Sequence, residues 1–299
     1  MKAIALWLGL VVACVAAACG TSTSTVGAQA GASPCRAAAR PTTYRHVIWI
    51  WMENHRRSQV IGSRAAPYIS TLATGCASAA DYRSVGSPSL PNYLGATSGS
   101  TQGVRDDGSP SSHPLSADNL FRQVRSAGGT AQTFAEAMPA PCTLVTRGRY
   151  AVKHNPAAYY VGADDRAACR RDNVPLGTLT SGAFADALDH DRLATFTFVE
   201  PDLCNDTHDC AVAVGDRWVS SWMARITASP AYQSGSTAVF LMWDEPTPMP
   251  FVAVAPSIAP GTVIGPAIDH YAILRLTEDL LGLPVHLARA VEAPDIRFL

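Results

Sequence analysis

The sequence predicts an α/β fold built on a mostly parallel sheet. Apolar runs of strand length alternate with segments of helical periodicity along most of the chain. Polar clusters follow three of these runs directly, and ligands of open α/β sheets bind at the carboxyl ends of the strands. With 299 residues, 47% hydrophobic and 16% charged, the chain is long enough for one large domain.

The first half of the chain contains two expected strands and two expected helices. Residues 44–52 are β-branched and aromatic, which is typical of a buried strand. Residues 66–77 place apolar side chains on one helical face, and residues 116–127 form a second helix that ends at a pair of glycines. Residues 130–138 follow as the next strand.

The second half continues the alternation. Residues 193–199 alternate as a strand does, and residues 216–226 form an amphipathic helix. Residues 237–243 and 250–256 are apolar strands, and residues 271–281 form a last helix that a glycine ends. No internal repeat is present.

The N-terminus has the pattern of an export signal. Lys2 precedes an apolar run that is short for a membrane span, and small residues follow, so residues 1–18 are expected to be a signal peptide. The run ends in Ala-Ala-Ala-Cys-Gly, which resembles a bacterial lipoprotein box with Cys19 as the lipidated residue; the alternative is ordinary cleavage after an Ala-x-Ala site. Residues 19–40 would be a flexible tether and residues 41–299 the catalytic domain. The chain is then expected in the bacterial cell envelope, or secreted.

Six cysteines remain beyond the signal, and an even number in an exported chain suggests three disulfides. Cys204 and Cys210 bracket a short loop. The other expected pairs, chosen by proximity, are Cys142 with Cys169 and Cys35 with Cys76. No C-x-x-C pair supports a zinc cluster, and a net charge of −1 without a basic run argues against a nucleic-acid partner.

Two pairs of residues with oxygen-bearing side chains follow expected strands. Glu53-Asn54 and Asp244-Glu245 offer carboxylate and amide oxygens, which suit hard divalent cations such as Mg²⁺, Ca²⁺ or Mn²⁺. The alternatives are a helix cap by Asn54 and a solvated turn at Asp244.

Three further clusters contain histidine. Asn205 to Asp209 places Asp206, His208 and Asp209 in a loop that a disulfide would close, which would position His208 as a general acid; an Asx-rich turn is the alternative. Lys153-His154 is either a binder of phosphate or sulfate oxygens or a charged turn. Asp269-His270 begins the last helix, where the plain interpretation is a capping aspartate and an exposed histidine.

Ser89 lies in the segment Ser-Pro-Ser-Leu-Pro-Asn. Pro91 fits the first turn of a helix and Pro88 favours an extended residue before it, so Ser89 is expected at a strand-to-helix junction. Helix N-termini favour anions, and a serine that touches a divalent cation can lose its proton and attack phosphorus. The alternative is an ordinary capping serine.

Taken together, the motifs resemble the bacterial phosphoesterase family of acid phosphatases and phospholipases C, a branch of the alkaline phosphatase superfamily. The resemblance runs from about His46 to Pro284. It rests, in the family's order, on MENHRRSQVIG, APYISTLATGCA, PSLPNYLGATSGSTQGVRDDG, YAVKHNPAAYY, PDLCNDTHDC, VGDRWV, WDE and DHYAILRLTEDLLGLP. It implies a three-layer α/β/α sandwich of the alkaline phosphatase type.

The resemblance also implies residue roles. Ser89 would be the nucleophile and His208 the acid. The residues that would hold the divalent metal, with Mg, Ca, Mn or Zn possible, are Glu53, Asn54, Asp244 and Glu245. The residues that would bind substrate are Asn92, Lys153, His154, Asp206, Asp209 and His270.

The expected activity is metal-dependent hydrolysis of phosphate monoesters through a phosphoserine. Substrates would be small phosphate esters or phospholipid head groups, with membrane contact through Cys19. The alternatives are a phospholipase C-like phosphodiesterase and an inactive lipid-anchored binding protein. Two departures from the family bear on these: Gly86-Ser87 stands where relatives often have Thr-His, and the loop after Glu245 is short.

Overall fold

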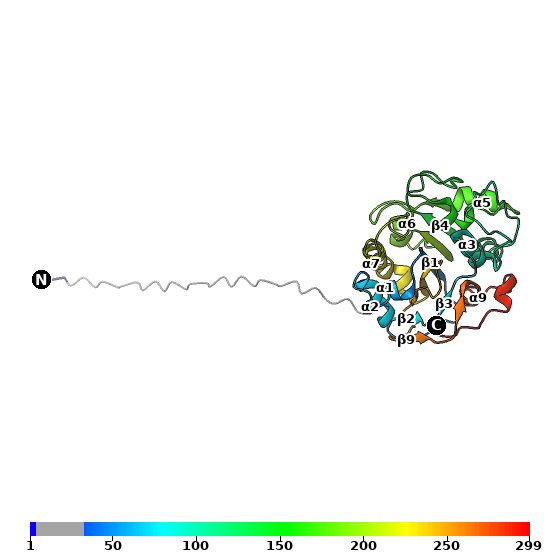
Figure 1. Ribbon diagram of the computed structural model, residues 1–299. Helices are drawn as coiled ribbons and strands as arrows, with labels where there is room; N and C mark the ends of the chain where they lie inside the picture. The colour runs from blue at the N-terminus through cyan, green and yellow to red at the C-terminus, as the bar shows by residue number, and fades with distance from the viewer. Residues whose placement is uncertain (4–32) are drawn as a thin grey trace. The chain divides into compact units, whose positions relative to one another are not determined.

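The computed structural model describes residues 1–3 and 33–299 (Figure 1). Most of the expected signal, the lipidation site Cys19 and most of the expected tether fall outside these residues. Residues 33–299 form one compact unit. Within the described part of the chain, no helix is long and apolar enough to cross a membrane.

The centre of the unit is an eight-stranded sheet of order β5-β4-β6-β1-β7-β8-β2-β9. Only β8 runs antiparallel to its neighbours, so the sheet is mostly parallel, as expected. A separate two-stranded sheet pairs β3 with β10. The strands are β1 His46–Met52, β2 Ala77–Ala79, β3 Tyr82–Arg83, β4 Ala131–Ala135, β5 Asn173–Pro175, β6 Phe196–Glu200, β7 Thr237–Trp243, β8 Phe251–Val254, β9 Thr262–Ile264 and β10 Ile268–Asp269.

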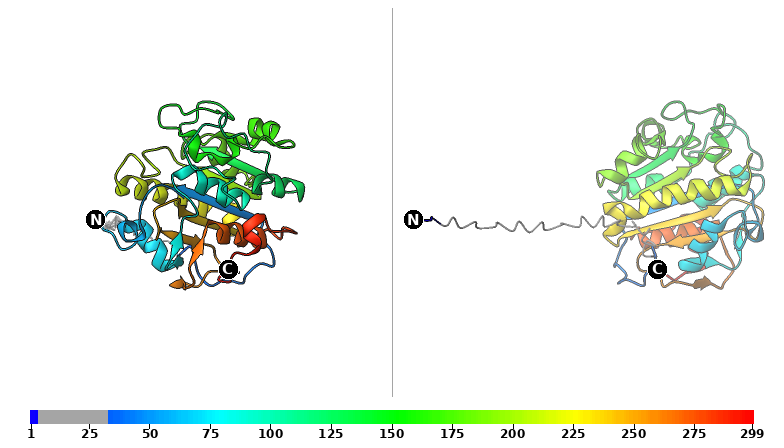
Figure 2. Two further views of the ribbon diagram at one scale, coloured as in Figure 1. Left: turned by 45° about the vertical axis from the view of Figure 1, so that its right-hand side comes forward. Right: turned by 90° about the vertical axis from the view of Figure 1, so that its left-hand side faces the viewer.

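Helices cover both faces of the sheet and complete the three-layer sandwich. One set packs around α7, which crosses its face of the sheet in Figure 2, and the other packs around α3 and α9. The helices are α1 Arg57–Val60, α2 Pro67–Gly75, α3 Ser89–Ser98, α4 Leu120–Ser126, α5 Asp165–Asp172, α6 Ala183–Asp189, α7 Val212–Ala228, α8 Pro230–Gln233 and α9 His270–Leu280, with 3-10 turns at Val152–His154, Pro156–Ala158 and Ala288–Val291.

The register of β1 and β7 positions the functional edge. Every residue of both strands is buried, and the two strands pair in parallel from His46 opposite Thr237 to Met52 opposite Trp243. Because the paired strands end at the same level, the residues that follow them, Glu53 and Asp244, emerge side by side. The core that fixes this register includes the fully buried Trp49, Trp51 and Trp243.

The folded unit begins earlier than the predicted boundary at residue 41. Cys35 is buried and bonded to Cys76, and the amides of Arg36 and Ala38 both donate to the carbonyl of Pro256. Residues 35–38 are therefore fixed to the domain, and the prediction of a tether extending to residue 40 was wrong. The other two disulfides join Cys142 to Cys169 and Cys204 to Cys210, the pairs expected from the sequence.

Candidate active site

Glu53-Asn54 and Asp244 meet at the carboxyl edge of the sheet. The amide of Asn54 donates to Asp244 Oδ1 over 3.1 Å. Asn54 has a φ of 53°, in the left-handed region that asparagine tolerates better than most residues. Glu53 and Asp244 are buried, whereas Asn54 and Glu245 are partly exposed. Glu53-Asn54 and Asp244-Glu245, expected from the sequence as two separate pairs, thus meet through the contact between Asn54 and Asp244.

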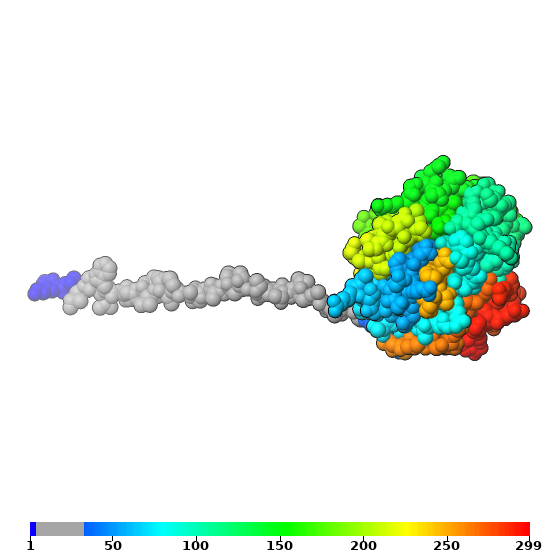
Figure 3. Space-filling view, in the orientation of Figure 1, coloured from blue at the N-terminus to red at the C-terminus, as the bar shows by residue number. Residues whose placement is uncertain are grey.

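The loops that follow these pairs are bound to each other. Arg56 donates to the carbonyl of Thr247, and the amide of Arg57 donates to the carbonyl of Pro248 over 2.8 Å. Thr247 Oγ1 also accepts from the amide of Ser84. The loop after β7 reaches the surface between the blue segment of α1 and α2 and neighbouring cyan segments (Figure 3). Three hydrogen bonds therefore anchor this short loop, two through its backbone carbonyls and one through the Thr247 hydroxyl.

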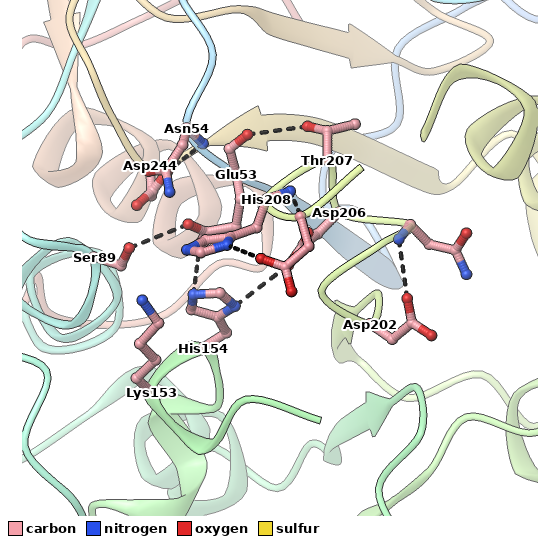
Figure 4. Close-up of polar contacts among 12 residues, drawn as sticks. Glu53, Asn54, Ser89, Lys153, His154, Asp202, Asp206, Thr207, His208 and Asp244 are labelled. Atoms are coloured by element: carbon pink, nitrogen blue, oxygen red, sulfur yellow. Dashed lines mark hydrogen bonds and ion pairs between the residues drawn. The ribbon is translucent and has the colours of Figure 1, made fainter. Parts of the chain in front are cut away.

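Ser89 is the first residue of α3 and faces the cluster. The preceding Pro88 is extended and provides no side-chain cap, so α3 begins with the serine itself. Ser89 is 2% exposed, and its hydroxyl donates to Glu53 Oε2 over 3.1 Å (Figure 4). The helix start predicted at Ser89 is therefore present, with residues 84–88 between it and the end of β3 at Arg83, and Ser89 lies beside the Glu53 carboxylate.

His154 lies on the other side of Glu53. Its Nε2 is 3.4 Å from Glu53 Oε1, and its Nδ1 is 3.4 Å from Asp206 Oδ2. The ring stacks on Tyr93 with centroids 5.3 Å apart, and it is 1% exposed. Burial, then the nearby Lys153, lowers the pKa of His154 well below its ordinary value. His154 is therefore a buried neutral imidazole between two carboxyl groups, not part of a charged surface turn.

The disulfide-closed loop presents His208 from the same side. Asp206 Oδ1 accepts from the amide of His208 over 2.7 Å, and His208 Nδ1 contacts Asp209 Oδ1 over 2.7 Å. Because a carboxylate only accepts, Nδ1 carries the proton and Nε2 is left for another partner. The Asp209 carboxylate is exposed and accepts the hydrogen bond from His208 Nδ1, so the structure does not place it as a substrate ligand.

The pKa values of three carboxyl groups are raised. Burial, then Asp244 and Asp206, raises the pKa of Glu53 well above its ordinary value. Burial raises the pKa of Asp206 to about 7, and burial with the charge of Glu245 raises that of Asp244 to about 7. Acids crowded in this way are stabilised either by protons or by a cation placed among them.

Two groups of residues offer ligand atoms to a cation. Ligand atoms of Glu53, His154 and His208 all lie within 4.8 Å of one another. The second group lies toward Ser89, where Asp244 Oδ2 is buried without a hydrogen-bond partner among the described residues. The ligand atoms of this group are the oxygens of Glu53, Asn54, Asp244 and Ser89. Glu53 belongs to both sets.

Two residues expected to bind substrate have other partners in the structure. The side-chain oxygen Oδ1 of Asn92 accepts from the backbone amides of Val85 and Gly86, and its Nδ2 donates to the backbone carbonyl of Gly86. This buried side chain therefore holds the loop before Ser89. His270 is fully buried and is not the exposed residue of the plain interpretation. Its Nε2 donates to the carbonyl of Asp244 over 2.9 Å and its Nδ1 accepts from Tyr82, so it positions the residue that follows β7.

Three contributors were missed from the sequence. Tyr93 donates to Glu53 Oε1; it lies four residues after Ser89, and that helical spacing was the available signal. Tyr82 donates to His270, and Asp107 accepts from both Lys153 and the amide of Leu90. Nothing in the local pattern points to Tyr82, and Asp107 stands in a polar loop typical of solvated turns.

Comparisons with known proteins show the family. The family model described as "Phosphoesterase family" matches residues 47–248. A phosphatidylinositol-3-phosphatase of Mycobacterium tuberculosis is 32% identical over 267 residues, covering 87% of this chain and 84% of that protein. A phosphate-repressible acid phosphatase of Penicillium chrysogenum is 26% identical over 288 residues, covering 88% of this chain and 68% of that protein.

Solved structures show the same fold. An alkaline phosphatase superfamily protein from Vibrio parahaemolyticus has a TM-score of 0.55 at 13% identity, covering 88% of this chain and 73% of that one. A sulfatase from Pseudoalteromonas has a TM-score of 0.53 at 11% identity, covering 84% and 72%. The fold expected from the sequence is confirmed. The chain is a hydrolase acting on phosphoric esters and belongs to the phosphoesterase family.

Proposed function

We propose that the chain is a metal-assisted phosphomonoesterase that acts through a phosphoserine at Ser89. The contact between the Ser89 hydroxyl and Glu53 Oε2 carries this proposal, because it places a hydroxyl at the start of a helix and against a buried acid. Helix N-termini favour anions, so this position suits both a nucleophilic oxygen and a phosphoryl group.

We assign the cation to the oxygen donors of Glu53, Asn54 and Asp244, with Glu245 beside them. Hard divalent cations prefer such donors, and the unpartnered Asp244 Oδ2 is a free coordination site. When bound, a divalent cation supplies positive charge that favours the serine alkoxide and neutralises phosphoryl oxygens. The set with His154 and His208 would instead favour Zn²⁺, so the metal bound identifies the set used.

The remaining residues divide the work of proton transfer and binding. Ser89 passes its proton to Glu53 Oε2, to which its hydroxyl donates, and attacks phosphorus in line, while the ester oxygen leaves with the Nε2 proton of a doubly protonated His208. Water then attacks the phosphoserine and gives a proton back to His208 Nε2, and Glu53 returns its proton to Ser89 as phosphate departs. Asp209 accepts from His208 Nδ1 in both steps, which keeps Nε2 directed toward the substrate. Lys153 binds the phosphoryl oxygens that the cation does not contact.

The names of the relatives support phosphate monoesters as the substrates. The names phosphatidylinositol-3-phosphatase and acid phosphatase both describe removal of a terminal phosphate. We therefore place small phosphate esters and phosphorylated lipid head groups ahead of diesters.

Ser89→Ala tests the function. It should lower turnover of p-nitrophenyl phosphate by 10³-fold or more, on the order of the loss when a nucleophile is removed, while Ser87→Ala, an exposed neighbour, keeps the activity. Acid quenching of the wild type with substrate should leave a phosphate on the peptide that contains Ser89. Undiminished turnover in Ser89→Ala would refute the assignment.

We further propose export with a lipid anchor at Cys19. The lipoprotein-like box and the three disulfides support it, since disulfides persist in oxidising compartments. Mass spectrometry of the N-terminal peptide from bacterial membranes should find a diacylglyceryl group on Cys19. An unmodified Cys19, or a chain cleaved elsewhere, would contradict the anchor.

A further inference from the structure

We propose that Asp107 is a positioning residue that holds Lys153 and the first turn of α3 in one frame, so that the Lys153 ammonium meets the phosphoryl group presented to Ser89. This inference rests on the proposed function of Ser89. The two carboxylate oxygens of Asp107 make separate contacts, one with the backbone of α3 and one with Lys153.

The first contact caps the nucleophile helix. α3 lacks a side-chain cap of its own, because Pro88 occupies the N-cap position. Asp107 Oδ1 accepts from the amide of Leu90 over 3.0 Å, although 17 residues separate the two along the chain. Leu90 directly follows Ser89, so Asp107 fixes the turn that carries the nucleophile.

The second contact orients the only lysine of the folded unit. The chain has two lysines, Lys2 and Lys153, and every other cationic side chain apart from histidine is an arginine. Lys153 Nζ donates to Asp107 Oδ2 over 3.0 Å, and both side chains are about a quarter exposed. In Figure 4 the Lys153 side chain extends toward the space between Ser89 and His154.

The charge of Lys153 is secured by its surroundings. Its Nζ lies 3.0 Å from Asp107 Oδ2, so the ammonium of this partly buried side chain has a carboxylate partner. Without Asp107, the ammonium would be free to turn toward Glu53 and Asp244. It would then neutralise the acids that hold the cation and no longer face the substrate.

The loop that presents Asp107 is itself anchored. The carbonyl of Gly108 accepts from the hydroxyl of Tyr159 over 2.9 Å, and Tyr159 is fully buried. Tyr159 lies six residues after Lys153. Both ends of the Asp107–Lys153 contact are therefore tied to the same stretch of chain, which favours a fixed geometry over a chance surface pair.

Asp107→Asn separates the two roles. The amide oxygen still accepts from the Leu90 amide, while the charge that holds Lys153 is lost. A charge-assisted hydrogen bond contributes on the order of a tenfold effect or more in binding. We therefore expect KM for p-nitrophenyl phosphate and the inhibition constant of inorganic phosphate to rise about tenfold, with a smaller change in kcat.

A double mutant shows whether Asp107 acts through Lys153. Lys153→Met should raise KM and the phosphate inhibition constant at least as much, and adding Asp107→Asn to it should change neither further. Asp106→Asn, an exposed neighbour whose amide oxygen can still accept, is the matched control and should behave as the wild type. Melting temperatures of all variants report on folding.

Chemical labelling gives a second measurement. Since Lys153 is the only lysine in residues 33–299, an amine-reactive reagent followed by peptide mass spectrometry reports on it alone there. Inorganic phosphate should protect Lys153 in the wild type and protect it less in Asp107→Asn. Unchanged KM in Asp107→Asn or Lys153→Met, or additive effects in the double variant, would overturn the inference. Ser89-dependent turnover in these same proteins would show that the proposed function still stands.

Discussion

Ser89 Oγ lies 3.1 Å from Glu53 Oε2, although 36 residues separate the two in sequence. The parallel register of β1 brings Glu53 to the sheet edge, and α3 begins at Ser89. Tyr93 and His154 contact the other oxygen of the same carboxylate. Glu53 is therefore the residue that joins the serine side of the site to the histidine side.

Glu53→Gln should abolish turnover without destabilising the protein. We expect kcat to fall by 10³-fold or more, on the order of losses at catalytic centres, because Gln supplies no charge for a cation or for Ser89. At neutral pH without added metal, the free energy of unfolding should not fall, since a crowded buried acid has been removed. Both are measured by p-nitrophenyl phosphate turnover and urea unfolding.

The control for Glu53→Gln is Glu200→Gln. Glu200 ends the neighbouring strand β6, is buried, and has a pKa raised well above its ordinary value. It has no contact with Ser89, so its amide variant should keep turnover. Equal losses in both variants would mean that general disruption of this edge, and not the Ser89 contact, explains the effect.

The contribution of Asp244 to the stability of the metal-free protein should fall as pH rises from 4 to 7. Asp244 has an ordinary pKa of 3.8 that the fold raises to about 7. Over this range the folded state keeps a proton that the unfolded chain has lost, so stability falls by up to about 4 kcal/mol for this group. A divalent cation should offset the loss most at high pH, where no proton competes with it.

Melting temperatures at pH 5.5 and 8 measure this effect, with and without Mg²⁺, Mn²⁺ or Zn²⁺. Asp244→Asn is the internal control, because it lacks the titrating group and should show a flatter pH dependence in the absence of metal. A larger metal-induced increase at pH 5.5 than at pH 8 would contradict the expected proton competition.

The sequence predicted the regular elements better than the partners of individual side chains. β7 has the predicted bounds, 237–243, because its apolar run is buried along its whole length. The start of a helix at Ser89 was predicted because its prolines fix local backbone geometry. The partners of Asn92 and His270 were not predicted, because their contacts with Gly86, Tyr82 and Asp244 depend on how loops and a two-stranded sheet pack, which no local pattern encodes.

Tyr82→Phe should destabilise the protein by about 1–3 kcal/mol, the cost of leaving a buried acceptor unpaired. His270 Nε2 must donate to the carbonyl of Asp244, so Nδ1 carries no proton and needs the Tyr82 hydroxyl. Burial lowers the pKa of His270 to about 4, so it stays neutral at pH 5 and above. Tyr68→Phe, whose hydroxyl has no hydrogen bond within the described residues, is the control for urea unfolding. Equal stability of the two variants would contradict this.

Removing the Cys204–Cys210 disulfide should affect activity more than folding. The bridge closes a loop with a sequence separation of only 6, so its entropic contribution is about 2 kcal/mol. The loop carries Asp206, which bonds the His208 amide, and His208 itself. When the bridge is lost, His208 should sample orientations away from the leaving group, and kcat should fall by about 10²-fold, the lower end for general acid catalysis.

Replacing both cysteines with serine tests this, with kcat measured on protein shown to be folded by its melting temperature. The comparison is the same replacement at Cys142 and Cys169, whose bridge has a sequence separation of 27 and closes a loop that carries Lys153 and His154 but not His208. That variant should lose more stability, because the loop it closes is longer, and should change KM, through Lys153, more than kcat. If the control loses as much kcat as the Cys204–Cys210 variant at equal folded fraction, the disulfide does not act by positioning His208.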